Sequence, residues 1–175
     1  MKLQRTILEI AVIAGTVFGL AQITIAQPTK QPEGKPAISL LLSANPQDIK
    51  IDESTQLGIT LKNISASELS VGRLVAESDD FDYHVMAVDD KGVEAPTTPY
   101  YRYVRGKRLP GDPHFVPPSR MIVMLKPDEV LKSQIKLDHL RLLDHAGTYT
   151  IWVERFDDIS KSRVKSNTVT VTVNP

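Results

Sequence analysis

Residues 96–120 bring together aromatic and basic side chains that are suited to molecular recognition. Half of the twelve prolines of the chain lie in this segment, and because proline fixes φ and lowers the entropy of a free loop, we expect an ordered excursion. Tyr and Arg side chains dominate binding hot spots. The candidate binding residues here are Tyr100, Tyr101, Arg102, Tyr103 and Arg105. The segment is interpreted either as a recognition loop for a protein, peptide or glycan, or as a long strand connection whose tyrosines cover the sandwich edge and whose arginines are solvated.

Acidic side chains dominate the preceding stretch, residues 68–94. Asp79, Asp80 and Asp82, together with Glu77, carry the carboxylates that a calcium ion prefers. No EF-hand spacing of ligands follows them. The pattern therefore favours a solvated acidic loop, which pairs with the basic segment after it, and we predict no metal and no cofactor.

The four histidines give no sign of catalysis or of a zinc site. They do not form a His-Glu-x-x-His motif, and the chain has no cysteine to complete a ligand set. A Gly-x-Ser-x-Gly elbow and a glycine-rich phosphate loop are also missing from the sequence. We therefore predict a protein that is not an enzyme, and a metal-dependent or hydrolytic activity is the least favoured hypothesis.

The N-terminal residues 1–26 have the pattern of a secretory signal peptide. Lys2 and Arg5 precede an apolar run over residues 10–21, and Thr24 and Ala26 place small side chains at a cleavage site. The run is shorter than the about 20 residues that span a bilayer. We expect cleavage, export to the periplasm or the exterior of a bacterium, and no membrane attachment afterwards.

The composition of the rest predicts a disordered spacer, residues 27–36, followed by one domain, residues 37–175. Lys and Arg number 21, as do Asp and Glu, so the chain lacks the basic excess of a nucleic-acid-binding protein. Because there is no cysteine, the fold must rely on packing without a disulfide, and a lipid anchor is excluded.

The elements that must position these side chains are short strands. In residues 148–154 and 168–173 apolar and polar residues alternate with a period of two, which is typical of strands with one face in a core. Further strands are expected near residues 38–42, 57–61, 81–88, 121–125 and 131–137. We also expect Ile49 and Ile51 to continue the first strand, and Asp138 to cap a helical turn. Either face of the strand at 81–88 is suitable for the core.

The strand spacing predicts an all-β fold, an immunoglobulin-like antiparallel β-sandwich of about seven strands with a long inserted loop. Asp144 begins a tight turn, and Gly147 leads into Tyr149 at the start of a strand. This run resembles the tyrosine corner of immunoglobulin-like sandwiches, in which a Tyr hydroxyl bonds to the backbone upstream of its strand.

Residues 55–63, 81–93 and 144–173 together resemble bacterial exported immunoglobulin-like or fibronectin-III-like modules. Residues 57–63, the turn at 89–92 and residues 147–149 more weakly resemble the bacterial intracellular proteinase inhibitor family. The second resemblance implies an inhibitor that presents the 96–120 loop to a protease.

Trp152 alternates with the inward-facing positions and is expected on the outer face of its strand. There it either stacks on a sugar or protein partner or is covered by the chain's own loop. The leading hypothesis is a non-catalytic exported interaction module that contacts a protein or glycan through the 100–105 residues and Trp152. Proteinase inhibition is the main alternative.

Overall fold

The computed structural model describes residues 34–76 and 79–175. The predicted signal peptide, residues 1–26, and residues 27–33 of the predicted spacer lie outside the described residues. Across the described ranges, no helix is long and apolar enough to cross a membrane.

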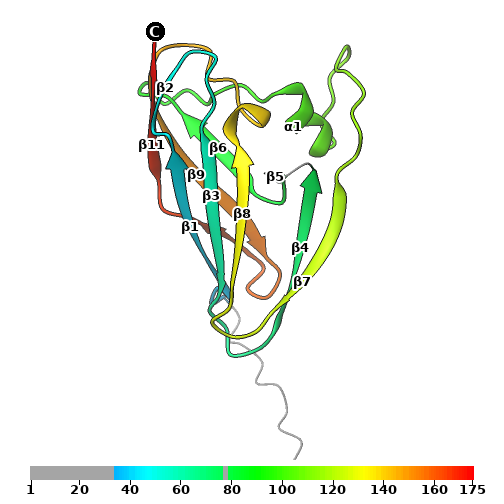
Figure 1. Ribbon diagram of the computed structural model, residues 1–175. Helices are drawn as coiled ribbons and strands as arrows, with labels where there is room; N and C mark the ends of the chain where they lie inside the picture. Colours follow the sequence, from blue (N-terminus) through cyan, green and yellow to red (C-terminus); the bar gives the residue numbers. More distant parts are fainter. Residues whose placement is uncertain (1–33, 77–78) are drawn as a thin grey trace, which may run out of the picture.

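Two sheets, packed face to face, make up the molecule (Figure 1). One sheet has the strand order β1-β3-β8-β5-β4-β7, and the other has the order β10-β9-β11-β2, with β6 also paired to β9. The strands are β1 (Ile38–Asn45), β2 (Asp48–Lys50), β3 (Gln56–Asn63), β4 (Leu69–Ala76), β5 (Asp79–Asp80), β6 (His84–Val88), β7 (Ser119–Leu125), β8 (Val130–Lys136), β9 (Gly147–Asp157), β10 (Ser162–Lys165) and β11 (Val169–Asn174). A short helix, α1 (Pro99–Val104), and a 3-10 turn, η1 (Leu137–His139), complete the described elements.

The predicted all-β immunoglobulin-like sandwich is confirmed, although the described residues form more strands than the about seven expected. The strands β4 and β10 were not anticipated. In β4 the alternation of Leu69 and Val71 is interrupted by Gly72 and Arg73, and β10 is mostly polar because it lies at a sheet edge. Local patterning is weak in both, so pairing with a neighbouring strand decides their conformation.

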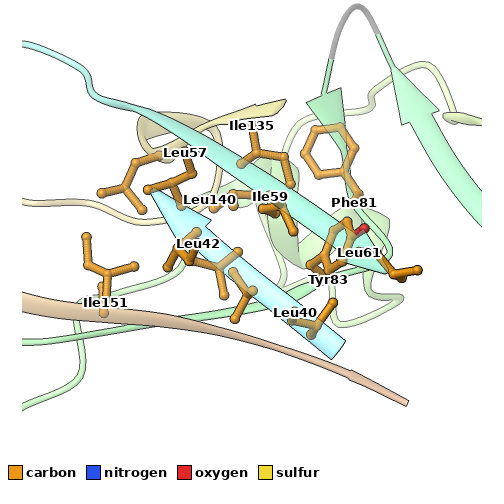
Figure 2. Packing of buried hydrophobic residues seen from close by; sticks show 14 of the residues in the cluster. Leu40, Leu42, Leu57, Ile59, Leu61, Phe81, Tyr83, Ile135, Leu140 and Ile151 are labelled. Atoms are coloured by element: carbon orange, nitrogen blue, oxygen red, sulfur yellow. The ribbon is translucent and has the colours of Figure 1, made fainter. Parts of the chain in front are cut away.

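The core lies between the two sheets and follows the period-two pattern. On β3 the side chains of Leu57, Ile59 and Leu61 are at most 1 % exposed, and on β9 Ile151 is fully buried opposite them (Figure 2). Burying such an aliphatic side chain contributes about 1.5–3 kcal/mol. This packing stabilises the sandwich without any disulfide.

The segment 81–88, of which only residues 84–88 form β6, turns its larger aromatic residues inward. Phe81, Tyr83 and Val85 are at most 1 % exposed, whereas His84 and Met86 are half-buried on the other face. The inward face is therefore the one that carries most apolar volume, as the hydrophobic effect requires.

The chain changes sheets at Pro46, so the expectation that Ile49 and Ile51 extend the first strand is wrong. Instead β2 runs parallel to β11 in the second sheet, with Ile49 opposite Val173. Ile49 is 3 % exposed because it packs into the core, whereas Ile51 lies past the end of β2. Alternation alone does not reveal which sheet a strand joins.

At the entry to β9, the hydroxyl of the fully buried Tyr149 donates to the main-chain oxygen of His145 at 3.2 Å. The rings of the two residues lie 5.3 Å apart. Asp144 holds Nδ1 of His145 at 2.9 Å, and Gly147 begins the strand. This is the geometry of a tyrosine corner, and it fixes the direction in which the chain enters the sandwich.

Candidate functional site

The predicted recognition loop begins with α1, which is fastened to the 3-10 turn by one threonine. Thr98 is the N-cap: its Oγ1 accepts a hydrogen bond from the amide of Tyr101 at 3.0 Å and donates to the oxygen of His139 at 2.6 Å. Pro99 occupies the first helical position, where a missing N–H costs nothing. Capping and proline therefore explain why the inserted loop starts as a helix.

Two of the predicted binding residues, Tyr101 and Arg105, make hydrogen bonds along the edge of β6. Tyr101 is 2 % exposed, and its hydroxyl lies 3.4 Å from the amide of Val85. Arg105 donates to the oxygen of Tyr83 at 2.6 Å and to the Tyr101 hydroxyl at 3.2 Å. The structure thus places Tyr101 in the core, which corrects its assignment as a contact residue. Its ring is buried there, and its hydroxyl provides a hydrogen-bond partner for main-chain groups at the edge of β6.

Arg141 completes the same edge, and the sequence analysis did not find it. Its guanidinium donates to the oxygen of Val85 at 2.6 and 3.0 Å and to that of Ala95 at 2.9 Å, and it pairs with Glu94 at 2.6 Å. The side chain is 2 % exposed. The one available signal is a single arginine within the leucine-rich run 137–143.

Arg102 closes the exposed part of the loop on itself. It donates to Asp112 from Nε at 3.0 Å and from Nη2, and to the oxygen of Thr97 at 2.6 Å. The Asp112 carboxylate also accepts from the amide of Leu109 at 2.8 Å. The Arg102 hydrogen bond, reinforced by the Leu109 amide, lowers the pKa of Asp112 to about 2. Arg102 is therefore a loop-positioning residue in this structure.

Between α1 and residues 113–119 lies an open groove of about 690 Å³, here called the aromatic–proline groove. Tyr100 is central: its ring meets those of Phe81 and Phe115 edge to face, at 5.3 and 5.0 Å. Tyr103 packs on the other side of Phe115 at 5.7 Å. Its lining includes Tyr100, Phe115, Val116, Pro117, Pro118 and Asp138.

The polar end of the groove is formed by η1. Asp138 accepts a hydrogen bond from the hydroxyl of Ser54 at 2.5 Å, which holds its carboxylate. The prediction that Asp138 caps a helical turn is wrong, because the cap position of η1 is Lys136, which makes no side-chain cap bond. The turn itself exists, but as a 3-10 helix.

Trp152 lies away from this groove, on β9. Its indole Nε1 donates to Glu154 at 3.1 Å, and the ammonium of Lys165 lies 4.0 Å from the ring centroid. The tryptophan is half-buried, and Lys165 on β10 lies over its ring. The structure therefore does not bring Trp152 together with the tyrosines.

The acidic cluster is built into the fold around Asp80. The fully buried Asp80 carboxylate accepts from Arg73 and from Ser133, both at 2.8 Å, and from the amide of Asp82 at 3.2 Å. Glu77 lies outside the described residues. Within residues 34–76 and 79–175, no group of three or more potential ligands is arranged to hold a metal ion.

Comparison with known proteins finds solved structures that align with most of this chain at low sequence identity. No protein family matches the chain, and no curated protein matches it in sequence. A β-glucosidase from Listeria innocua in complex with glucose aligns with 80% of this chain at 16% identity and a TM-score of 0.42, and the chain spans 16% of that enzyme. The alkylpurine DNA glycosylase AlkC of Pseudomonas fluorescens aligns at 11% identity and a TM-score of 0.42, covering 80% of this chain and 31% of the glycosylase. The CARDB domain of the PF1109 protein from Pyrococcus furiosus, in complex with di-metal ions, aligns at 10% identity and a TM-score of 0.40, covering 82% of this chain and 97% of that domain.

Proposed function

We propose that this chain is a non-catalytic binding module whose contact surface is the aromatic–proline groove. One observation carries the proposal: an open groove of about 690 Å³ whose wall is made of aromatic rings and prolines. Ligand-binding clefts typically enclose about 300–1,000 Å³ and are mostly apolar with a few polar groups. The groove has that character, since Tyr100 and Phe115 form its apolar part and Asp138 lies at its polar end.

The shape and chemistry favour a short extended segment of a partner protein. Edge-to-face rings and prolines form a rigid wall, so few side-chain rotamers have to be immobilised on binding. Proline-rich peptides and apolar side chains pack well on such surfaces. Tyr100 and Tyr103 thus stay in the proposed site, whereas Arg102 and Arg105 hold its support in place. A glycan is the second class of occupant that the test distinguishes.

The test uses a residue of the groove that the fold does not need. The side chain of Val116 is 83% exposed within the groove, so Val116→Arg changes the site and not the core. Leu109→Arg, at a position that is 55% exposed and does not line the groove, is the matched control. Peptides selected from a displayed library should bind the wild type and the Leu109→Arg variant and lose at least about tenfold in affinity for Val116→Arg.

Two results would reject the groove. Selected peptides that bind all three proteins equally would place the contact elsewhere. A library that yields no binder, together with glycan-array signals that Val116→Arg leaves intact, would remove the peptide-binding proposal altogether.

Proteinase inhibition is placed second because of the helix in the loop. A protease cleft binds an extended segment, but residues 99–104 are helical and Tyr101 is buried. The remaining exposed parts of the loop, residues 106–111, 113–114 and 116–117, would have to act alone. An inhibitor should slow a protease in proportion to added protein, and Lys107→Ala with Arg108→Ala should remove that effect.

Export is part of the proposal and is supported by the sequence pattern of residues 1–26. The basic start, the short apolar run and the small residues before Gln27 have the order of a signal peptide. Mass spectrometry of the protein recovered outside the cytoplasm of an expressing bacterium should give a chain that begins at Gln27. An intact N-terminus in the cytoplasmic fraction would contradict export.

A further inference from the structure

The strand β7 forms an open edge of the six-stranded sheet. It pairs with β4 over its whole length, and among the described residues no other strand lies beside it (Figure 1). An edge strand presents a row of main-chain donors and acceptors that can pair with a further strand.

The direction of these groups follows from the bonds of β4. The oxygens of Gly72 and Leu74 point away from β7, since they accept from Arg155 and from the amide of Phe81. In a strand the main-chain groups of successive residues alternate in direction. The main-chain groups of Val71 and Arg73 therefore point toward β7, where they bond the main chain of the residues opposite, Val123 and Met121.

The alternate residues of β7 consequently aim outward. These are Arg120, Ile122 and Met124, whose amides and carbonyls point to the open side. Three apolar side chains of β7 are exposed: Met121 is 50% exposed, Ile122 70% and Met124 52%. Arg120 is the one charged residue on the strand.

On two other edge strands, β1 and β6, groups from elsewhere in the chain bond part of the main chain. The side-chain amide of Asn167 accepts from the main-chain N–H of Leu42 on β1 at 2.8 Å and donates to the Leu42 oxygen at 3.0 Å. On β6, the Arg141 guanidinium and the amide of Ala95 take up the oxygens of Val85 and Ala87. A sandwich that bonds the main chain at these edges and leaves β7 open, with Met121, Ile122 and Met124 exposed, has the feature of an assembly surface.

We propose that β7 pairs antiparallel with β7 of a second copy of this chain, so that the two six-stranded sheets become continuous. Centring the pair on Ile122 sets this residue opposite its own copy and Arg120 opposite Met124 of the second copy. All three positions then exchange both main-chain hydrogen bonds, about six bonds in total. The exposed Met121 faces Val123 of the other copy, so the apolar side chains cover one another.

A second copy fits this edge because the strand is complementary to itself. In the register centred on Ile122 all seven residues are paired and the arginines of the two copies lie apart. A shift that centres the pair on Arg120 sets two like charges directly opposite, which is destabilising. An isologous two-fold contact of this kind closes at a dimer and leaves no further edge of the same type.

Cysteine cross-linking tests the register directly, because the chain has no cysteine of its own. In the proposed pair the two Ile122 Cα atoms lie about 5.5 Å apart, within the range of a disulfide. Oxidised Ile122→Cys should run as a covalent dimer on a non-reducing gel. Leu41→Cys, 60% exposed on β1 at the other end of the same sheet, is the control that should remain monomeric.

Sedimentation equilibrium of the mature protein tests the assembly without cross-linking. The mass of the wild type should rise toward twice the monomer value with concentration, and Ile122→Lys should stay monomeric with an unchanged melting temperature. Leu41→Lys should still dimerise. A wild type that stays monomeric overturns the proposal, and so does an Ile122→Lys variant that dimerises as well as the wild type. A monomer whose β7 amide NMR signals shift when an unrelated extended peptide is added also overturns it.

Discussion

At the scale of single residues, buried polar side chains complete the main-chain hydrogen bonds where strands run out of neighbours. Arg141 does so for β6, and Tyr101 and Arg105 assist it. A buried main-chain group without a partner costs about 1–3 kcal/mol, so these side chains are tied to the fold more strongly than their surface-like residue types suggest.

Arg141→Met should therefore be among the most destabilising single changes in the chain. It leaves the oxygens of Val85 and Ala95 without their donors in the interior, and removing one member of such a buried network typically costs about 3–5 kcal/mol. Urea unfolding measures the loss. Arg163→Met, at a side chain that is 63% exposed, is the control and should stay within about 0.5 kcal/mol.

His145 should titrate above its ordinary pKa of 6.5. The hydrogen bond to Asp144 is the main cause of the raised pKa, and Asp89, 3.5 Å from Nε2, adds to it. Because the folded-state pKa is raised, this contribution to stability is full below about pH 6.5 and is lost as the pH rises through the folded pKa. An NMR titration of the ring protons should show the raised midpoint, and Asp144→Asn should lower it more than Asp89→Asn. Equal midpoints in all three proteins would contradict the assignment.

At the scale of elements, the inserted segment is a helix followed by a loop pinned by one ion pair. Thr98 fixes the start of α1, and Asp112 ties the exposed part back to Arg102. The segment is therefore ordered by polar contacts at Thr98 and Asp112, and the rings of Tyr100 and Phe115 pack together in the wall of the groove.

Asp112→Asn should loosen this loop without unfolding the sandwich. The charge that holds Arg102 is lost, so trypsin should cut after Lys107 or Arg108 several times faster, while the unfolding free energy changes by at most about 1 kcal/mol. A cleavage rate equal to that of the wild type would show that the pair does not hold the loop.

The same pair gives the loop a defined response to acid. The pKa of Asp112 is lowered to about 2, so its contribution is present above about pH 4 and is lost as the pH falls through about 2. The Leu109 amide, which donates to this carboxylate, reports the change. Its NMR shift should stay constant down to about pH 3.5 and then move.

At the scale of the whole molecule, the two sheets are joined at their margins by side chains as well as by the core. Asn167, in the loop before β11, bonds Leu42 on β1, and the buried Asp157 on β9 accepts from the amide of Ala37 at 2.6 Å. These contacts link residues more than a hundred positions apart in the chain, so the sheets should unfold together.

Asn167→Ala should lower the unfolding free energy by about 1–3 kcal/mol, because both main-chain groups of Leu42 lose their partner. Thr168→Ala, at the exposed neighbouring position, is the control. Thermal unfolding followed by circular dichroism gives the difference. Since the change also opens the β1 edge, light scattering after heating should increase, and unchanged scattering would show that this edge needs no cover.

The groove shows how far residue types alone can locate a site. The tyrosines and arginines of segment 96–120 point to a site there, and Tyr100 does line a groove, with Tyr103 packed on its Phe115, but Tyr101 is buried. On a helix of one and a half turns, neighbouring residues point in different directions, so consecutive tyrosines cannot share one surface. Phe81 and Asp138 could not be added from the sequence, because they come from other parts of the chain.

The sequence by itself determined the sandwich class, the core faces of β3, β9 and β11, and the corner at Tyr149, because period-two alternation and turn chemistry are local properties. Tertiary structure alone decided which sheet β2 joins, that Arg141 and Tyr101 close the edge of β6, and that β7 remains open. These features depend on which strands become neighbours. Hydrogen bonds between distant segments select those neighbours, and no short stretch of residues carries that information.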